Sequence, residues 1–241
     1  MNVALVQLRA ELRRVAGNGE QLLLTLGIPV LLLVFFSLVD VLPTDTPEPI
    51  DFLAPGILAL ATMSTAMVSL GIGTGFERSY HVLKRLGTTP LGRPRLVAAK
   101  IGSVIAVEIV QCAVLIPVAF ALGWDPASPS WLLAVAGVIV GTMAFAGIGL
   151  TMAGRLPGEV NLAAQNGLYV VLLLLGGMVI PFAELPGAIR AVAHVLPSGA
   201  LADVLRDALG SAATQPTRSW IVLCVWAVVT PLLASRLFRW D

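Results

Sequence analysis

The chain has 241 residues, of which 57% are apolar and only 12% are charged, and its mean hydropathy is +0.91. A water-soluble fold could not bury so large an apolar share, and disordered chains are poor in apolar residues and rich in charge. The net charge of +1 gives no basic excess for nucleic-acid binding, so the composition predicts an integral membrane protein. Cys112 and Cys224 lie inside apolar runs, and their spacing from the two histidines predicts packing residues and no metal site.

Six segments approach or reach the roughly 20 helical residues that a bilayer core requires. They are residues 22–39, 52–75, 101–122, 131–153, 160–182 and 220–237. We therefore expect an all-α integral membrane protein in which residues 1–241 form a single transmembrane domain.

Positive charge is distributed unevenly among the segments that connect these spans. If both termini are cytoplasmic, 12 of the 15 Lys and Arg residues fall on the cytoplasmic side, as the positive-inside rule requires. Only Arg190, Arg206 and Arg218 then lie outside. The sequence predicts a multi-pass protein of the plasma (inner) membrane with both termini in the cytoplasm.

Residues 3–17, before the first span, show the pattern of an amphipathic helix. Leu5, Leu8, Leu12 and Val15 share one helical arc, whereas Glu11, Arg13 and Arg14 lie outside it. Such a helix suits the cytoplasmic surface of the membrane. Gly17-Asn18-Gly19 favours a break before the first span; the alternative is a continuous extension of that span.

The first cytoplasmic loop, residues 76–95, is the one elaborate and basic connection. It contains a short amphipathic stretch at residues 79–86. Gly87 and Gly92 have the spacing of a phosphate-binding loop, but Arg93-Pro94 follows in place of Lys-Ser or Lys-Thr, and Pro90 removes a backbone N–H. If the protein uses ATP, another chain must bind it.

The long outer segment, residues 183–219, has a helical pattern interrupted by proline. Leu185, Ile189, Val192 and Leu196 recur at steps of three and four residues, and Pro197 follows them. We expect a re-entrant helical hairpin between spans five and six, made of two short helices that meet at Pro197.

A few polar residues lie within the apolar spans. Glu108 is the only acidic residue deep in a span, Gln111 lies one turn away on the same face, and Gln165 and Asn166 are in the fifth span. A membrane carboxylate is costly unless it is paired or neutralised. Two interpretations stay open: these groups line a path, or a protonated Glu108 makes interhelical hydrogen bonds to the amides.

Small residues predict close helix packing at two places. Gly71, Gly73 and Gly75 recur near the end of the second span, where they indicate either close packing or fraying of the helix end. Gly137 and Gly141 form a small-xxx-small pair in the fourth.

Two stretches resemble the permease subunits of type-2 ATP-binding cassette exporters, in particular the branch that exports drugs and antibiotics. Residues 76–100 carry Glu-Arg after the second span, then Leu-Lys-Arg-Leu, Thr-Pro-Leu and a Lys that opens the third span. Residues 176–197, with Ala200 and Leu205-Arg206, are similar to the fifth span and outer hairpin of the same family. The sequence departs from the pattern at residues 79–81, where Glu and Gly are common.

The resemblance implies that two permease subunits, identical or different, pair around a central path, and that two separate ATPase subunits bind ATP and Mg²⁺ and dock beneath them. This chain would itself be no enzyme and would hold no cofactor. The residues implied for ATPase coupling are Glu77, Arg78, Tyr80, Leu83, Lys84, Arg85, Leu86, Thr89 and Pro90. Those expected to line the path are Glu108, Gln111, Gln165, Asn166 and Tyr169.

The compact chain and its apolar spans favour export of an amphiphilic drug, antibiotic or lipid-like molecule. Polysaccharide or lipid-linked glycan export is the alternative, although few rings, those of Phe120, Phe145 and Tyr169, lie in the interior of spans three to five. A self-sufficient carrier would need ion-coupling groups or inverted repeats. An intramembrane enzyme would need a nucleophile and base at membrane depth, and neither histidine is deep in a span.

Overall fold

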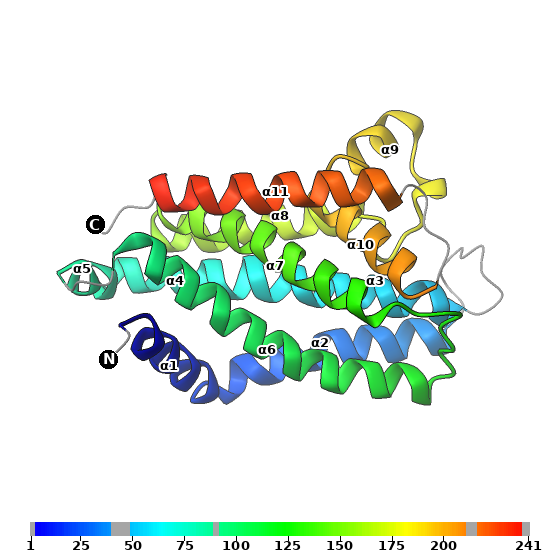
Figure 1. Cartoon of the computed structure of the whole chain (residues 1–241), viewed down its shortest axis with the longest axis horizontal. Helices are drawn as coiled ribbons and strands as arrows, with labels where there is room; N and C mark the ends of the chain where they lie inside the picture. Colours follow the sequence, from blue (N-terminus) through cyan, green and yellow to red (C-terminus); the bar gives the residue numbers. More distant parts are fainter. Residues whose placement is uncertain (1–2, 40–48, 89–91, 211–215, 238–241) are drawn as a thin grey trace.

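The computed structural model describes residues 3–39, 49–88, 92–210 and 216–237, and every regular element in these ranges is helical (Figure 1). The α-helices are α1 (Val3–Ala16), α2 (Gly19–Leu38), α3 (Pro49–Met63), α4 (Leu70–Ser79), α5 (Val82–Gly87), α6 (Arg93–Ala121), α7 (Trp131–Ala153), α8 (Gly158–Leu175), α9 (Gly187–Ala193), α10 (Pro197–Ala208) and α11 (Pro216–Leu237). A π-helix, η1 (Ser64–Ser69), joins α3 to α4, and a 3-10 turn, η2 (Phe182–Glu184), precedes α9. The all-α prediction is confirmed.

Within the described ranges, five helices are long and apolar enough to cross a membrane, and α2 adds a shorter apolar helix over Leu22–Leu38. The second span is the continuous rod Pro49–Ser79, built from α3, η1 and α4. The predicted fifth span, residues 160–182, is too long, because α8 ends at Leu175. The chain then turns at Gly177, whose φ of +61° suits glycine, and a β-carbon there would lie 2.7 Å from the Phe182 ring.

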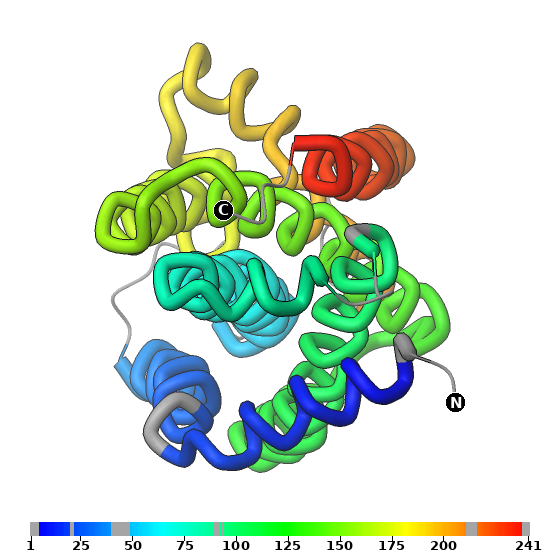
Figure 2. Tube along the Cα trace, turned by 90° about the vertical axis from the view of Figure 1, so that its left-hand side faces the viewer, coloured from blue at the N-terminus to red at the C-terminus, as the bar shows by residue number. Residues whose placement is uncertain are grey.

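The rod of α3, η1 and α4 forms the centre of the bundle. Every residue from Leu53 to Met63 is buried, as expected of a helix that is apolar on all sides. Figure 2 shows this rod (cyan) surrounded by α2, α6, α7 and α8. A displacement of α3 or α4 therefore changes the packing of several spans together.

Small residues allow the close approaches that the sequence predicts. A β-carbon on Gly137 would lie 2.8 Å from Val204, and one on Gly141 would lie 2.9 Å from Leu201, so α7 packs directly against α10. On α4, a β-carbon at Gly71 would lie 2.1 Å from the Nε2 atom of Gln165. These glycines are packing residues, as predicted.

The predicted helical hairpin between spans five and six is confirmed, with α9 and α10 meeting at an angle of 78° and Pro197 as the first residue of α10. Arg206, which sequence alone places in an outer connection, is fully buried in α10. It donates hydrogen bonds to the carbonyl oxygens of Gly177 (2.7 Å) and Met178 (3.2 Å), and its guanidinium lies 3.8 Å from the centre of the Phe52 ring. One cation thus fastens the hairpin to the loop after α8 and to α3.

Candidate functional site

One end of the bundle gathers α1, the end of α4, α5 and the start of α6 (Figure 1). The chain leaves α4 through His81, whose φ of 59° is left-handed, and α5 follows as a single short helix. A residue in the left-handed region cannot continue a right-handed helix, so α5 is a separate short helix and not an extension of the rod. The end of α4, this turn and α5 carry the residues that the family resemblance implies for ATPase coupling, apart from Thr89 and Pro90.

The predicted coupling residues divide into three groups. Tyr80, Lys84 and Arg85 are exposed, with 72% of the Tyr80 surface accessible, and Leu86 is half-buried. Leu83 is completely buried and anchors α5 to the bundle. Thr89 and Pro90 lie outside the described residues. The third group, Glu77 and Arg78, faces the protein interior.

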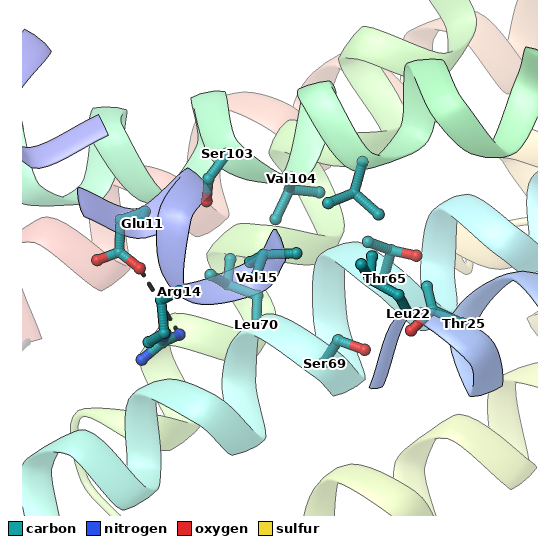
Figure 3. A pocket seen from close by; sticks show the side chains of 11 residues that line it. Glu11, Arg14, Val15, Leu22, Thr25, Thr65, Ser69, Leu70, Ser103 and Val104 are labelled. Carbon is teal, nitrogen blue, oxygen red and sulfur yellow. Dashed lines mark ion pairs between the residues drawn. The ribbon is translucent and has the colours of Figure 1, made fainter. Parts of the chain in front are cut away.

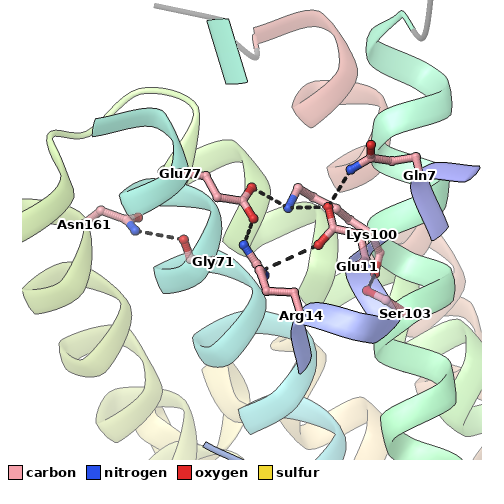
Figure 4. Close-up of polar contacts among 8 residues, drawn as sticks. All are labelled: Gln7, Glu11, Arg14, Gly71, Glu77, Lys100, Ser103 and Asn161. Carbon is pink, nitrogen blue, oxygen red and sulfur yellow. Dashed lines mark hydrogen bonds and ion pairs between the residues drawn. The ribbon is translucent and has the colours of Figure 1, made fainter. Parts of the chain in front are cut away.

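Glu77 belongs to a cluster of four charged side chains that joins three helices (Figure 4). Its carboxylate pairs with Arg14 of α1 and, at 2.7 Å, with the Nζ atom of Lys100 of α6. Glu11 completes the cluster at 3.2 Å from Lys100 and 3.6 Å from Arg14. Lys100 is 0% exposed and Glu77 is 11% exposed, so solvent screens these pairs weakly. We call these four residues the charge cluster.

Neighbouring polar groups complete the surroundings of the charge cluster. Gln7 donates a hydrogen bond to Glu11 at 2.9 Å, and Ser103 donates one to the carbonyl oxygen of Lys100 at 2.8 Å. A hollow of about 30 Å³ lies beside it, lined by residues of α1, α2, η1, α4 and α6 (Figure 3). That volume holds one or two water molecules and is too small for a transported molecule.

Arg78 ties the same end of the rod to the opposite side of the bundle. Its Nη1 atom donates hydrogen bonds to the carbonyl oxygens of Ala153 (3.2 Å) and Leu156 (3.3 Å), at the turn between α7 and α8. Glu77 and Arg78, adjacent in sequence, therefore fasten α4 to two separate parts of the molecule.

The five predicted path residues are not gathered in one place. Gln111 is buried: its Nε2 atom donates to the carbonyl oxygen of Thr25 at 2.9 Å, and its Oε1 atom accepts from Thr65 at 3.0 Å. Glu108, one turn away, accepts a hydrogen bond from Thr142 at 2.5 Å. An interhelical bond to the Glu108 carboxyl thus exists, but its donor is a threonine of α7.

Gln165 is also an interior residue. It donates to the carbonyl oxygen of Gly149 at 2.9 Å and lies 3.3 Å from Asn161, which in turn donates to the carbonyl oxygen of Gly71 at 2.9 Å (Figure 4). Asn161 was not predicted among the polar residues of the fifth span. Its position one helical turn before Gln165 is the signal that could have identified it. The two amides lock α8 against α4 and α7.

Asn166 and Tyr169 lie together on a different surface. They line a hollow of about 320 Å³ with Leu24, Ile28, Pro29, Leu60, Ser64 and Val68. A second hollow of about 480 Å³ shares four of these residues and continues along η1 and α4 to Phe76. We call the two together the α2–α8 groove.

The π-helix η1 lies along this groove and was not predicted from the sequence. Ser64, Val68 and Ser69 of η1 all contribute to the lining. Short π-helical segments are frequent at functional sites because they disturb the regular hydrogen bonding of a helix.

The fold is that of a polytopic helical membrane protein. Residues 4–209 match the model of the ABC-2 type transporter family, and the chain belongs to that family. It is 25% identical over 202 residues, 82% of each chain, to a Bacillus subtilis (strain 168) protein named "Putative transport permease YvfS". The resemblance to type-2 permeases is confirmed, and the family implies association with an ATP-binding cassette ATPase.

Proposed function

We propose that this permease exports an amphiphilic drug, antibiotic or lipid-like molecule across the plasma membrane, paired with a second permease subunit. Two ATPase subunits, which hold the ATP and Mg²⁺, would dock at α5, and both termini would be cytoplasmic. The observation that carries the proposal is the geometry of α5. It is a short helix, anchored by Leu83, that presents Lys84 and Arg85 outward at the end of the central rod, and Tyr80 is exposed just before it.

The chemistry of α5 suits insertion into a cleft on an acidic partner. Its exposed cations border a shallow hollow of about 400 Å³ together with His81 and Thr88. Complementary charge would orient the ATPase, and the exposed Tyr80 ring would supply apolar contact area. Because Leu83 holds the helix in place, a force on α5 would reach α4 directly.

The α2–α8 groove is the best candidate for the transport path. Leu24 and Ile28 on its α2 wall are about half exposed, so a second permease subunit could complete the enclosure. The walls are mainly apolar with the hydroxyls of Ser64 and Tyr169 and the amide of Asn166, a mixture that suits amphiphiles. A glycan path would be expected to offer more rings than the two at Phe76 and Tyr169.

The test is co-expression with candidate ATPase subunits, co-purification, and reconstitution into vesicles for a screen of compounds that raise ATP hydrolysis. Reversing both α5 charges, with Lys84→Glu and Arg85→Glu, should abolish ATPase co-purification. The matched control is Arg236→Glu, an exposed cation of α11 at the same end of the bundle. Equal co-purification of the α5 variant and the control would refute docking at α5.

A further inference from the structure

A further cavity, separate from the hollows described above, lies on the side of the molecule formed by α6, α7 and α10. Its volume is about 330 Å³, within the range of small-molecule sites. Its lining includes Ile109, Val135 and Ile139, which are all exposed on the bundle surface. The cavity is therefore open sideways, towards the acyl chains of the bilayer.

Glu108 gives this otherwise apolar cavity one strongly polar group. The side chain lies midway along α6 and is only 3% exposed. Thr142 donates to its Oε2 atom, but its Oε1 atom has no hydrogen-bond partner within the described part of the chain. The described lining residues include no cation. A buried carboxyl oxygen without a partner is costly in an apolar environment, and a ligand with a suitable donor would remove that cost.

We propose that this lateral cavity binds lipophilic amines that enter from the bilayer. The ammonium group would donate to the Oε1 atom of Glu108, and the alkyl or aryl body would lie along Cys112 and Ile116 towards Trp131. An ammonium is the complementary partner for a lone carboxylate, because pairing neutralises both charges in a medium of low polarity.

The lateral cavity is separate from the proposed transport path. Leu58 of α3 lines the cavity, whereas Leu60 lines the α2–α8 groove. Residues that are two positions apart on an α-helix are rotated by about 200° around its axis. Leu58 and Leu60, and with them the two sites, therefore lie on opposite faces of the central rod. Binding in the cavity can therefore be measured without the ATPase and without transport, independently of the proposed function.

The probe is a dodecylamine with a photoreactive diazirine on its chain, applied to the purified full chain in phosphatidylcholine nanodiscs. Mass spectrometry locates the labelled peptides, and the diazirine analogue of dodecane, which lacks the amine, serves as a comparison. Glu108→Gln removes the charge at nearly constant size. Val135→Trp narrows the cavity mouth on an exposed position, and its matched control is Val110→Trp, on the exposed surface of α6 outside the lining.

We expect the amine to label the cavity walls in α6, α7 and α10. Glu108→Gln should lower that labelling about tenfold, because one charge-assisted hydrogen bond is lost. Val135→Trp should lower it about as much, because access to the cavity is reduced. Val110→Trp should label as the parent does. Size-exclusion profiles and thermal stability confirm folding; if Glu108→Gln does not fold, Val135→Trp decides. Equal labelling by amine and alkane, or labelling unaffected by both cavity variants, would overturn the proposal and indicate an ordinary lipid contact.

Discussion

Removing the Lys100 ammonium should destabilise the end of the bundle that holds the charge cluster more than any surface substitution. Lys100→Met keeps the length of the side chain but leaves the carboxylates of Glu11 and Glu77 with Arg14 as their only partner in the charge cluster. Removing one member of a buried ion pair costs about 3–5 kcal/mol, because the remaining charge stays buried without compensation. Arg14 is 46% exposed and can partly compensate both carboxylates, so the expected loss is about 3 kcal/mol.

The free energy of unfolding can be measured in mixed detergent micelles titrated with a denaturing detergent. Lys84→Met is the matched control, since Lys84 is exposed on α5, and its effect should stay within about 0.5 kcal/mol. Limited proteolysis with trypsin gives a local readout: Lys100→Met should accelerate cleavage within α1, which the charge cluster holds in place.

A double variant separates the electrostatic explanation from simple loss of packing. Adding Glu77→Gln to Lys100→Met removes one uncompensated carboxylate. The free energy of unfolding of the double variant should therefore be about 1–2 kcal/mol higher than the sum of the two single losses predicts. If the two losses add without recovery, or if Lys100→Met matches the Lys84→Met control, the buried charge cluster does not stabilise this end.

Three further perturbations test other parts of the structure. Gly71→Ala should cost about 1–3 kcal/mol of unfolding free energy, because its β-carbon would meet Gln165, whereas Gly27→Ala, with open space around it, should be neutral or slightly stabilising. Arg206→Gln should cost about 2–3 kcal/mol in the same unfolding assay, through loss of the charged donor to two carbonyl groups; a change below that of Gly27→Ala would contradict its anchoring role. Tyr169→Ala should lower vesicle transport while ATPase co-purification stays unchanged, and unaltered transport would argue against the groove as the path.

The positions of the spans follow from local properties of the sequence, which is why they can be predicted. Apolar length and the prolines near residues 186 and 197 define the spans and the outer hairpin without any knowledge of tertiary contacts. The fifth span was predicted seven residues too long because residues 176–182 remain apolar. Their apolar side chains pack in a turn beneath α10, and hydropathy does not distinguish that turn from a helix.

The orientation of the N-terminal helix shows what local patterns miss. The break before the first span is confirmed, but Glu11, predicted to lie outside the apolar arc, is buried against the bundle. Glu11 is turned inward because Lys100, distant in sequence, supplies the opposite charge. Such a pairing between distant residues has no signature in a single sequence.

The five residues predicted to line the path lie in different places for a related reason. Amides and carboxyls within spans are equally compatible with a lined path and with bonds between helices. Gln111 and Gln165 form such bonds, whereas Asn166 and Tyr169 remain on a groove wall. Which role each residue takes depends on the helix that packs against it, and here the close approach at Gly71 places Gln165 in the interior.

These contacts constrain how a force on α5 could travel through the molecule. The end of α4 is fastened by Glu77 to α1 and α6, and by Arg78 to the turn between α7 and α8. A displacement of α5 that preserves these contacts must therefore move this whole end of the bundle, including α1. Further along the same rod, Phe52 is fastened to the hairpin of α9 and α10 through Arg206. The π-helix η1 lies between these two anchors and lines the groove, so it is the segment of the rod where a relative rotation of the two ends would change the shape of the groove.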